Sequence, residues 1–441
     1  MIAVDEPLFV IDDDPTGAQA QAGVPLLMSW DEELLADVLA EEPAALHLLT
    51  NSRALDEDGA YEVVRAAATA AGAASPEPRL VLRGDSTLRA HLLPEYAGVR
   101  DALAPGETPP LLLVPALPAA GRITVDGRHL LERGGVRTPL DQTEFAADAD
   151  FAYHSSRLVD WAQERSGGYF AVADGREIGL AAIRSQAGAE LVCQALLDAV
   201  ADSRPAVVVP DAENEADLAT IAAGLLRAWE QAPAIVVRCA PTFASVLSGA
   251  GAEGLVPVPA AGPGLLVVVG SHVPVSSAQL ETLIRRHPGS LVEIDAATLA
   301  GGEEAEEVAA LSATAVERAR ALLRSDGLAV VATSREIAAA GLGPVGGTNV
   351  ARALARIAAE LRSDSGVLVS KGGSTSAINV RDGLGAESVE IVGPVAPGIS
   401  LWLVPTAGAE PYPVIVFPGN VGDAGTLADL VDLILGGRER C

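Results

Sequence analysis

Short apolar runs alternate with longer alanine-rich segments of helical periodicity, and this alternation constrains the fold more than any other feature. In the first half of the chain the apolar runs occupy residues 8–12, 45–52, 79–86, 111–117, 206–211 and 234–239. Amphipathic helical segments occupy 56–72 and 213–232. Runs that are apolar at nearly every position predict parallel strands buried on both faces, and helices between them predict crossover connections.

The alternation stops at a glycine- and proline-rich stretch, "SGAGAEGLVPVPAAGPG", and then starts again. The later strands are predicted at 264–271, 290–295, 328–334 and 366–373, and the later helices from about Ser276, near 303–325 and near 348–362. A chain of 441 residues is too long for one ordinary core. We therefore predict an α/β fold of two α/β domains with mainly parallel sheets, at 1–245 and 264–441, joined by a linker at 246–263.

The composition sets limits on partners and location. Hydrophobic residues make up 49% and aromatic residues 3%, so the core must consist of Ala, Val, Leu and Ile. A net charge of −29 argues against nucleic acid, but it permits a small anionic substrate where arginines gather locally. The N-terminal residues lack a basic segment typical of signal peptides, no apolar run approaches the ~20 residues of a membrane span, and the three cysteines make no metal pattern. These features predict a soluble cytoplasmic protein without membrane contact, and they leave open whether it forms a homo-oligomer.

Acidic residues end the first predicted strand in "VIDDDPTGAQ". Asp12, Asp13 and Asp14 follow the strand directly, at the edge of an open α/β sheet where ligands bind. Three adjacent carboxylates repel one another unless a cation lies among them, either Mg²⁺ or a basic side chain. The pattern predicts a functional cluster, and the alternative is an acidic turn.

Arginines follow the next strands, in "TNSRAL" and "RGDSTLRAH". We expect Arg53, Arg83, Asp85, Ser86 and Arg89 at the same sheet edge as the acidic cluster. Guanidinium groups suit a substrate carboxylate, and an aspartate beside them can accept a proton from a hydroxyl. The alternative is that these arginines only pair with excess acid.

The segment 118–169 has little periodicity, and we interpret it as a long irregular stretch of functional importance. It adds Arg122, Asp126 and Arg128 to the candidate residues. His129 lies among these charged residues, so by itself it suggests a surface histidine.

Three strand ends in the second half are rich in glycine: "GSH" at 270–272, "KGGSTS" at 371–376 and "FPGNVGD" at 417–423. The second is predicted to open directly into a helix, whose free N–H groups favour phosphate. A Walker A motif is absent from the sequence, and "GLGPVG" at 341–346 is interpreted as a loop before a helix, with a dinucleotide fingerprint as the weaker alternative. Together the three turns suggest a nucleotide cradle that is not a P-loop.

Lys371 is the only lysine in the chain, and it stands beside Gly372 and Gly373 at a strand end. We expect its ammonium group near the phosphates of a bound nucleotide. The alternative is that Lys371 points to solvent and that only the backbone of the turn matters.

Several long segments, in this order along the chain, resemble one known family. They are "DDDPTGAQ", "TNSRAL", "RGDSTLRAHLLPE", "PALPAAGRITVDGRH", "TEFAADADFAYHSSRL", "GSHVPVSSAQLE", "SKGGSTS", "PGISLW" and "VFPGNVGD". On these segments the chain resembles the four-carbon acid sugar kinases, nearly from end to end. The resemblance implies an N-terminal domain that binds an acid sugar, a C-terminal domain that binds ATP with Mg²⁺, and an active site in the cleft between the two domains.

The resemblance also implies which residues bind the two substrates. The residues implied for the acid sugar, with Arg122 added from its neighbours in sequence, are Asp12, Asp13, Arg53, Arg83, Gly84, Asp85, Ser86 and Arg122. Those implied for ATP are Ser271, Gly372, Gly373, Ser374, Thr375, Gly419 and Asn420. The metal ligands stay unassigned.

The expected reaction is phosphorylation of the terminal hydroxyl of a 3-oxo-tetronate, threonate or erythronate. Arg53 and Arg83 would hold the substrate carboxylate, Asp85 or else Asp13 would act as the base, and Lys371 would place positive charge near the transferred phosphoryl group. A branched acid sugar such as 3-oxo-isoapionate is the alternative substrate. A non-catalytic sensor of ATP or sugar acids, and a dehydrogenase built on "GLGPVG", are the competing classes.

Overall fold

The structure is a computed structural model that describes residues 7–17, 21–252, 254–302, 306–335 and 343–436. Part of the "DDDPTGAQ" segment (Ala18, Gln19), part of "GLGPVG" (Gly341, Leu342) and Cys441 lie outside the described residues. The chain divides into two compact units, Met1–Gly251 and Ala252–Cys441, called unit 1 and unit 2 below.

Unit 1 is built on a parallel sheet. Its strands are β1 (Leu8–Asp12), β2 (Val24–Leu27), β3 (Ala45–Leu49), β4 (Leu80–Arg83), β5 (Leu111–Val114), β9 (Arg176–Ile178), β10 (Val207–Pro210) and β11 (Val236–Cys239). They lie in the order β2-β3-β1-β4-β11-β5-β10-β9, and each of these neighbouring pairs is parallel. The parallel α/β prediction is therefore confirmed, although the short strands β2 and β9 were not predicted.

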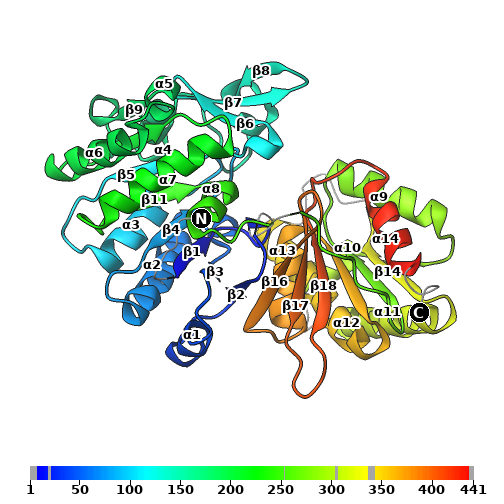
Figure 1. Ribbon diagram of the computed structural model, residues 1–441. Coiled ribbons are helices and arrows are strands. Elements are labelled where there is room, and N and C mark those ends of the chain that lie inside the picture. Colours follow the sequence, from blue (N-terminus) through cyan, green and yellow to red (C-terminus); the bar gives the residue numbers. More distant parts are fainter. Residues whose placement is uncertain (1–6, 18–20, 253, 303–305, 336–342, 437–441) are drawn as a thin grey trace. The chain divides into compact units, whose positions relative to one another are not determined.

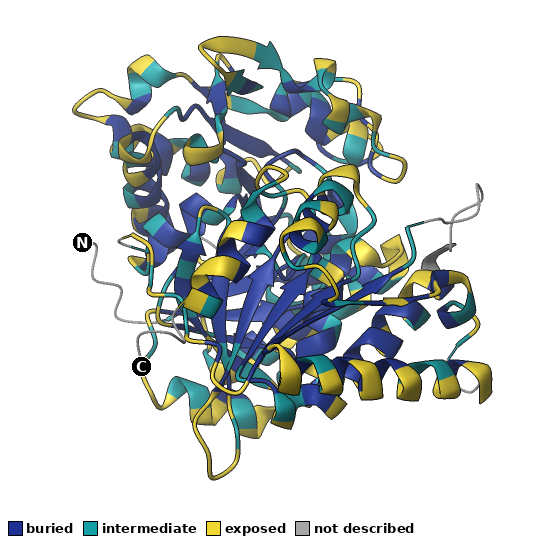
Figure 2. Cartoon of the chain, turned by 90° about the vertical axis from the view of Figure 1, so that its right-hand side faces the viewer, coloured by how far each residue is buried: buried dark blue, intermediate teal, exposed yellow. Residues whose placement is uncertain are grey.

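Helices cover both faces of this sheet (Figure 1), and the strands that can be seen in Figure 2 are coloured as buried along most of their length. The helices are α1 (Glu32–Leu39), α2 (Glu57–Ala74), α3 (Leu92–Leu103), α4 (Leu158–Arg165), α5 (Leu180–Ile183), α6 (Gly188–Ala201), α7 (Glu215–Trp229) and α8 (Pro241–Ser248). Side chains of α2, α3 and α4 pack with alternate strand residues such as Phe9, Ile11 and Leu82 in one core. The remaining strand residues, Val10 and Val81 among them, are equally buried, as expected for a sheet enclosed on both faces.

The segment 118–169 is more regular than the sequence suggested, and that prediction was wrong in part. It contains an antiparallel sheet of β6 (Arg122–Val125), β7 (Arg128–Arg133) and β8 (Val136–Pro139), followed by α4. The carboxylate of Asp211 accepts hydrogen bonds from the backbone N–H groups of Asp126 and Gly127, at 2.8 and 2.9 Å. Because charged residues dominate these strands, their apolar alternation is too weak to read from sequence.

Unit 2 has a mixed sheet. Its strands are β12 (Leu265–Val269), β13 (Leu291–Ile294), β14 (Leu328–Thr333), β15 (Val367–Lys371), β16 (Ser388–Ala396), β17 (Ile399–Val404) and β18 (Tyr412–Phe417). Within the order β13-β14-β12-β15-β18-β17-β16, the pairs from β13 to β18 are parallel and the last two pairs are antiparallel. The parallel part places the carboxyl ends of β12, β15 and β18 at one edge of the sheet.

The helices of unit 2 are α9 (Pro274–Arg286), α10 (Ala296–Leu299), α11 (Glu306–Ser325), α12 (Gly343–Leu361), α13 (Gly373–Ile378) and α14 (Thr426–Gly436). Leu280 and Leu283 of α9 and Leu427 of α14 pack with one set of alternate β12 residues. The prediction of a loop at "GLGPVG" was wrong for its described residues. From Gly343 onward they form the first turn of α12, well after β14 ends at Thr333 in the sequence. This placement does not fit a dinucleotide turn, which must follow its strand directly.

Within the described parts of the chain, a search for helices long and apolar enough to cross a membrane finds none.

Two helical glycines give a matched test of the packing. A Cβ atom on Gly98 of α3 would lie 2.9 Å from the carbonyl oxygen of Tyr61 and 3.0 Å from the amide nitrogen of Arg65, both in α2, whereas a Cβ on Gly347 of α12 meets nothing within 4 Å. We expect Gly98→Ala to lower the free energy of unfolding by about 1–3 kcal/mol, because backbone cannot yield as a flexible side chain can. Gly347→Ala should raise it by about 0.5–1 kcal/mol through helix propensity. Urea unfolding measures both, and equal effects would contradict the close α2–α3 contact.

Candidate active site

A buried ion pair ends strands β1 and β4. Asp12 and Arg83 are neighbours in the register of these strands, and Nε of Arg83 donates to Oδ1 of Asp12 at 2.6 Å. The other carboxylate oxygen of Asp12 lies 2.7 Å from Nδ1 of His47, a β3 residue that the sequence analysis did not select. Burial by itself raises the pKa of Asp12, but the charges of Arg83 and His47 outweigh it and lower that pKa.

Asp13 and Asp14 are held by the same arginines. Arg53 binds Asp13 through two nitrogens, at 2.7 and 3.1 Å, and Nη1 of Arg83 lies 3.1 Å from Oδ1 of Asp13. Nη2 of Arg83 donates to the backbone carbonyl of Asp14. Both oxygens of Asp13 and all three nitrogens of Arg83 are therefore engaged within the protein.

The acidic cluster is thus neutralised by basic side chains, one of the two arrangements that its sequence allowed. Among the described residues, no group of three or more His, Cys, Asp or Glu side chains is placed to hold a metal ion. The carboxylates of Asp12 and Asp13 already accept from arginine donors, so they do not fit a resident metal.

Asp85 differs from these carboxylates because one of its oxygens is open. Oδ2 accepts from Nε of Arg89 at 2.7 Å and from the hydroxyl of Thr87, whereas Oδ1 has no hydrogen-bond partner in the parts of the chain that the structure describes. Burial raises the pKa of Asp85, but the charges of Arg53 and Arg89 lower it well below its usual range. Asp85 is therefore ionised at neutral pH and has one oxygen available to a ligand.

The loop that holds Asp85 is strained and closely packed. Leu88, three residues further on, is buried with φ at 70°, a conformation that costs a leucine about 1–3 kcal/mol. A Cβ atom on Gly84 would collide with the guanidinium of Arg238. Only glycine therefore fits between the end of β4 and this arginine.

Arg238 is a site residue that sequence reasoning missed. Its Nη1 donates to Oε2 of the buried Glu95, whose Oε1 accepts from the hydroxyl of Ser52 at 2.7 Å. Its Nη2 lies 3.7 Å from Oδ2 of Asp13 and has no hydrogen-bond partner among the described residues. An arginine inside the apolar strand "AIVVRC" was the available signal. Glu95 ends the segment "RGDSTLRAHLLPE" that carried the family resemblance, but the sequence analysis gave it no role.

A small hollow lies next to this network. It is lined by Gly84, Asp85, Leu88, Leu113, Pro115, Trp161, Arg238 and Cys239. These residues belong to β4, β5 and β11 or to segments that follow them, apart from Trp161 of α4. The hollow is therefore at the carboxyl edge of the sheet, as expected for a ligand site in an open α/β fold.

The β6–β7 hairpin adds Arg122 and His129. The expectation of a surface histidine was wrong: His129 is fully buried, with Nε2 2.8 Å from the carbonyl oxygen of Ser86 and Nδ1 3.1 Å from the hydroxyl of Thr124. Burial lowers its pKa to about 4, so it is neutral at pH 7. It fixes the backbone next to Asp85, which sequence could not show because the contact joins distant segments.

Arg122 is a cation without a carboxylate partner among the described residues. Its guanidinium lies over the ring of Phe145, 5.6 Å from the ring centroid, and its Nε is buried without a hydrogen bond. Burial lowers its pKa. Among the described residues, Arg122 and the open oxygen of Asp85 are therefore two charged groups with unsatisfied capacity in this region, besides Nη2 of Arg238.

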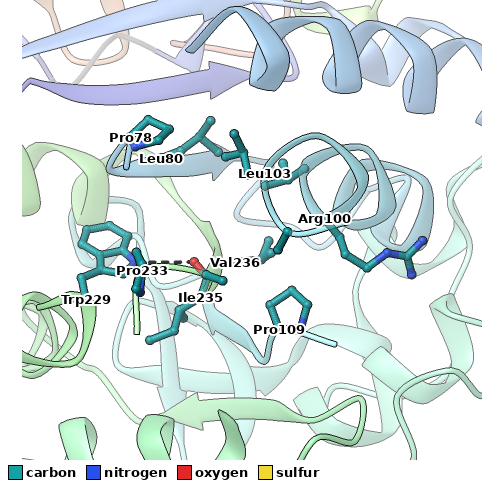
Figure 3. A pocket seen from close by; sticks show the side chains of 12 residues that line it. Pro78, Leu80, Arg100, Leu103, Pro109, Trp229, Pro233, Ile235 and Val236 are labelled. Carbon is teal, nitrogen blue, oxygen red and sulfur yellow. Dashed lines mark hydrogen bonds between the residues drawn. The ribbon is translucent and has the colours of Figure 1, made fainter. Parts of the chain in front are cut away.

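A larger apolar pocket lies elsewhere in unit 1 (Figure 3). Leu80 and Val236, the first residues of β4 and β11, line it together with Pro109 and Trp229. It is therefore at the amino ends of the strands, opposite the charged network. The guanidinium of Arg100 points away from Trp229 in Figure 3, and it pairs with Asp101 at 2.7 Å. The pocket offers little polar chemistry.

In unit 2 the three predicted glycine turns meet around Ser271. A Cβ atom on Gly372 would lie 3.3 Å from Cβ of Ser271 and 3.1 Å from Oγ1 of Thr375, and one on Gly419 would lie 2.5 Å from Oγ of Ser271. Gly372 also has φ at 124°, a conformation open to glycine alone. Gly373 and Ser374 begin the short helix α13, and Asn420 is exposed in the third turn.

Lys371 is fully buried, so the alternative that it points to solvent was wrong. Its Nζ donates to the backbone carbonyls of Pro418 and Gly419 and lies 4.0 Å from the ring centroid of Phe417. Burial lowers its pKa to about 7. The ammonium thus joins two of the three turns.

Arg335, another residue that sequence reasoning passed over, supports the first turn. Its Nη1 donates to the carbonyl of Ser271 at 2.6 Å, and its Nη2 donates to the hydroxyl of Thr333 at 3.0 Å. In the described parts of the chain it has no carboxylate within ion-pair distance. Unit 2 therefore brings two cations, Lys371 and Arg335, to backbone oxygens at one sheet edge.

Comparison with protein families agrees with this division of chemistry. A model of a sugar-binding N-terminal domain matches residues 8–247, and a model of a nucleotide-binding C-terminal domain matches residues 266–427. The chain belongs to the four-carbon acid sugar kinase family. The charged network thus lies in the family's sugar-binding domain, and the glycine turns lie in its nucleotide-binding domain.

Similar proteins include one that is named as a kinase. The D-threonate kinase of Salmonella typhimurium is 28% identical over 443 aligned residues, which cover 96% of this chain and 97% of the relative. A Haemophilus influenzae protein of known structure has a TM-score of 0.65 at 18% identity, with 97% of this chain and all of that chain covered. A Salmonella typhimurium structure has a TM-score of 0.69 at 17% identity, with coverage of 96% and 98%. The two structures support the fold.

Acid unfolding tests the buried ion pair between Asp12 and Arg83. The folded-state pKa of Asp12 is lowered, so its stabilising contribution is present above the unfolded pKa of about 3.9 and is lost as pH falls below it. We expect Asp12→Asn to lower the free energy of unfolding at pH 7 by about 3–5 kcal/mol, because the buried guanidinium of Arg83 loses the charge of its nearest carboxylate. Below pH 4 the difference in the free energy of unfolding between wild type and variant should become smaller. A gap that stays constant from pH 7 to pH 3.5 in urea unfolding would contradict this assignment.

Proposed function

We propose that this chain is an ATP-dependent kinase that phosphorylates the terminal hydroxyl of a four-carbon acid sugar. Membership of the acid sugar kinase family and similarity to a D-threonate kinase support the reaction class. The observation that most favours catalysis is the open oxygen of Asp85 together with the unpartnered Arg122. One can accept a hydrogen bond from a hydroxyl, and the other can bind a carboxylate.

In the proposed mechanism Asp85 orients the attacking hydroxyl. Its lowered pKa makes it a weak base, so it accepts the proton late, when the hydroxyl oxygen has begun to bond to phosphorus. Phosphoryl transfer tolerates a weak base because the transition state is loose and depends on position and charge. Asp13, the alternative base, has both oxygens bound to arginines, and we assign it to holding Arg53 in place.

The proposed substrate contacts follow from which arginine side chains still have hydrogen-bonding capacity for a ligand. Arg83 has no nitrogen left for a ligand, so we propose that it organises Asp12 and Asp13, and that Asp13 in turn orients Arg53. Arg122 is then the best candidate to bind the carboxylate of the acid sugar, and Arg53, whose charge also acts on Asp85, is the second candidate. Gly84 and Ser86 shape the loop around Asp85.

ATP would bind the turns of unit 2, at Ser271, Gly372 to Thr375, Gly419 and Asn420. Magnesium commonly binds through substrate phosphates, one or two carboxylates and water, so an all-protein metal site is not required. We therefore propose MgATP as the donor, in which the metal neutralises phosphate charge. A coupled ADP-release assay should show turnover with threonate, erythronate or a 3-oxo-tetronate. Turnover only with a branched acid sugar would change the substrate, and no turnover with any of them would favour a sensor.

Asp85→Asn tests the proposed base. The amide keeps the shape of the side chain and lacks the charge, so we expect kcat to fall by about 10²- to 10⁴-fold while thermal unfolding shows an intact fold. Asp101→Asn is the matched control, since Asp101 pairs with Arg100 on α3, away from the network. Turnover close to wild type in Asp85→Asn would rule out this role.

Arg122→Gln tests the proposed carboxylate contact. Loss of a charged hydrogen bond should raise KM for the acid sugar by about 10- to 100-fold and leave KM for ATP nearly unchanged. Arg133→Gln, on the neighbouring strand β7 and with an exposed ion pair to Glu144, is the control and should change neither constant. An equal rise in both KM values for Arg122→Gln would contradict a specific role in sugar binding.

A further inference from the structure

The turn after β18 has its carbonyl groups fixed from one side. Nζ of Lys371 donates to the carbonyls of Pro418 and Gly419, the latter at 3.1 Å. From α9, the hydroxyl of Ser276 donates to the carbonyl of Gly419 at 2.8 Å. Nε2 of Gln279 donates to the carbonyls of Val421 and Asp423, at 2.9 and 2.8 Å. All three side chains are fully buried.

This arrangement determines where the amide groups of the turn point. The structure has no cis peptide bonds among its described residues, and in a trans peptide the carbonyl of one residue points opposite to the N–H of the next. The N–H groups of Gly419, Asn420 and Gly422 therefore face away from Lys371, Ser276 and Gln279. These three N–H groups have no hydrogen-bond partner among the described residues. Successive free N–H groups on one side of a turn form an anion-binding concavity.

The ammonium of Lys371 is positive, as are the partial charges on the free N–H groups of the turn. The ammonium of Lys371 binds neutral oxygens and the face of Phe417, and no carboxylate among the described residues lies within ion-pair distance of it. Burial is the only cause that shifts its pKa. When Lys371 is protonated, its positive charge has no counter-ion among the described residues and lies on the side of the turn opposite the free N–H groups, which favours a polyanion bound to those N–H groups.

We infer that Lys371, Ser276 and Gln279 are positioning residues that orient the 418–422 turn so that its N–H groups bind the phosphates of the nucleotide. This inference rests on the proposed function for the identity of the nucleotide. It differs from the direct contact expected from sequence, because Lys371 acts through the backbone of the turn. It also assigns a role to Ser276 and Gln279, which do not point at the ligand.

Isothermal titration with ADP and with inorganic pyrophosphate, each with magnesium, tests the inference on Ser276→Ala, Gln279→Met and Lys371→Met. Loss of one orienting hydrogen bond in Ser276→Ala, and of two in Gln279→Met, should weaken binding of both probes by roughly 3- to 10-fold. Lys371→Met, which also removes the charge, should lose more than roughly tenfold. Ser277→Ala, the adjacent serine of α9 with no side-chain hydrogen bond in the structure, is the matched control and should bind as wild type.

Acid-sugar binding separates a positioning role from loss of fold. It should stay unchanged in Ser276→Ala and Gln279→Met, and Ser276→Thr, which keeps the hydroxyl, should restore ADP affinity. If Lys371→Met does not fold, the two α9 variants decide the question. Folded Ser276→Ala and Gln279→Met proteins that bind both probes with wild-type affinity would overturn the inference, even if Lys371→Met alone lost binding.

The two probes also separate this inference from the proposed function. Wild-type protein that binds pyrophosphate but not ADP, with the predicted losses in the variants, would support the anion-binding turn and reject the nucleotide kinase. Wild-type protein that binds neither probe would overturn both. Binding of both probes without phosphorylation of any acid sugar would leave the turn supported and the kinase rejected.

Discussion

The pairing of Asp12 with Arg83 is the interaction on which the proposed sugar site depends. A buried carboxylate is tolerated only where a cation compensates for its lost hydration, and here the register of β1 and β4 supplies that cation directly. Arg83 then reaches Asp13 and the backbone of Asp14. The cost of desolvating these charges offsets most of the attraction between them, so the network adds little to the free energy of unfolding. It does fix each charged group in one orientation. Asp85 and Arg122, at its border, are left with free capacity for a ligand.

At the carboxyl edge of the sheet in unit 2, the charged side chains have different partners. Its predicted ligand is an anion. The cations near its glycine turns contact neutral groups: Lys371 contacts two carbonyls and a ring, and Arg335 contacts Ser271 and Thr333. Carboxylate partners would cancel the field that attracts phosphate. In unit 1 the arginines Arg53 and Arg83 pair with carboxylates, whereas Lys371 and Arg335 of unit 2 have no carboxylate partner among the described residues. This contrast agrees with the sugar-binding and nucleotide-binding models that match the two halves.

The candidate residues from the sequence analysis differ in whether their side chains are free to bind a ligand. Asp85 keeps the capacity for a ligand that a catalytic role requires, whereas Arg83 and Asp13 are occupied within the protein. His47, Glu95 and Arg238 complete the network although the sequence analysis assigned no role to them. His129 proved to be buried because β7 places it behind the Asp85 loop, where its ring meets the carbonyl of Ser86. Such contacts join segments between 35 and 143 residues apart, which local patterns do not encode.

Sequence by itself determined the α/β class, most of the parallel strands and the edge at which the site lies. These follow from local rules, since apolar runs become buried strands and the residues after parallel strands gather at their carboxyl ends. The hairpin in 118–169, the antiparallel strands β16 and β17 and the helical start of α12 at Gly343 escaped this reasoning, because tertiary contacts outweigh weak local preferences. Only the tertiary structure decided which charges are satisfied. Whether Lys371 meets solvent, a phosphate or the carbonyls of Pro418 and Gly419 depends on how β15 and β18 pair, and no property of the lysine itself determines that.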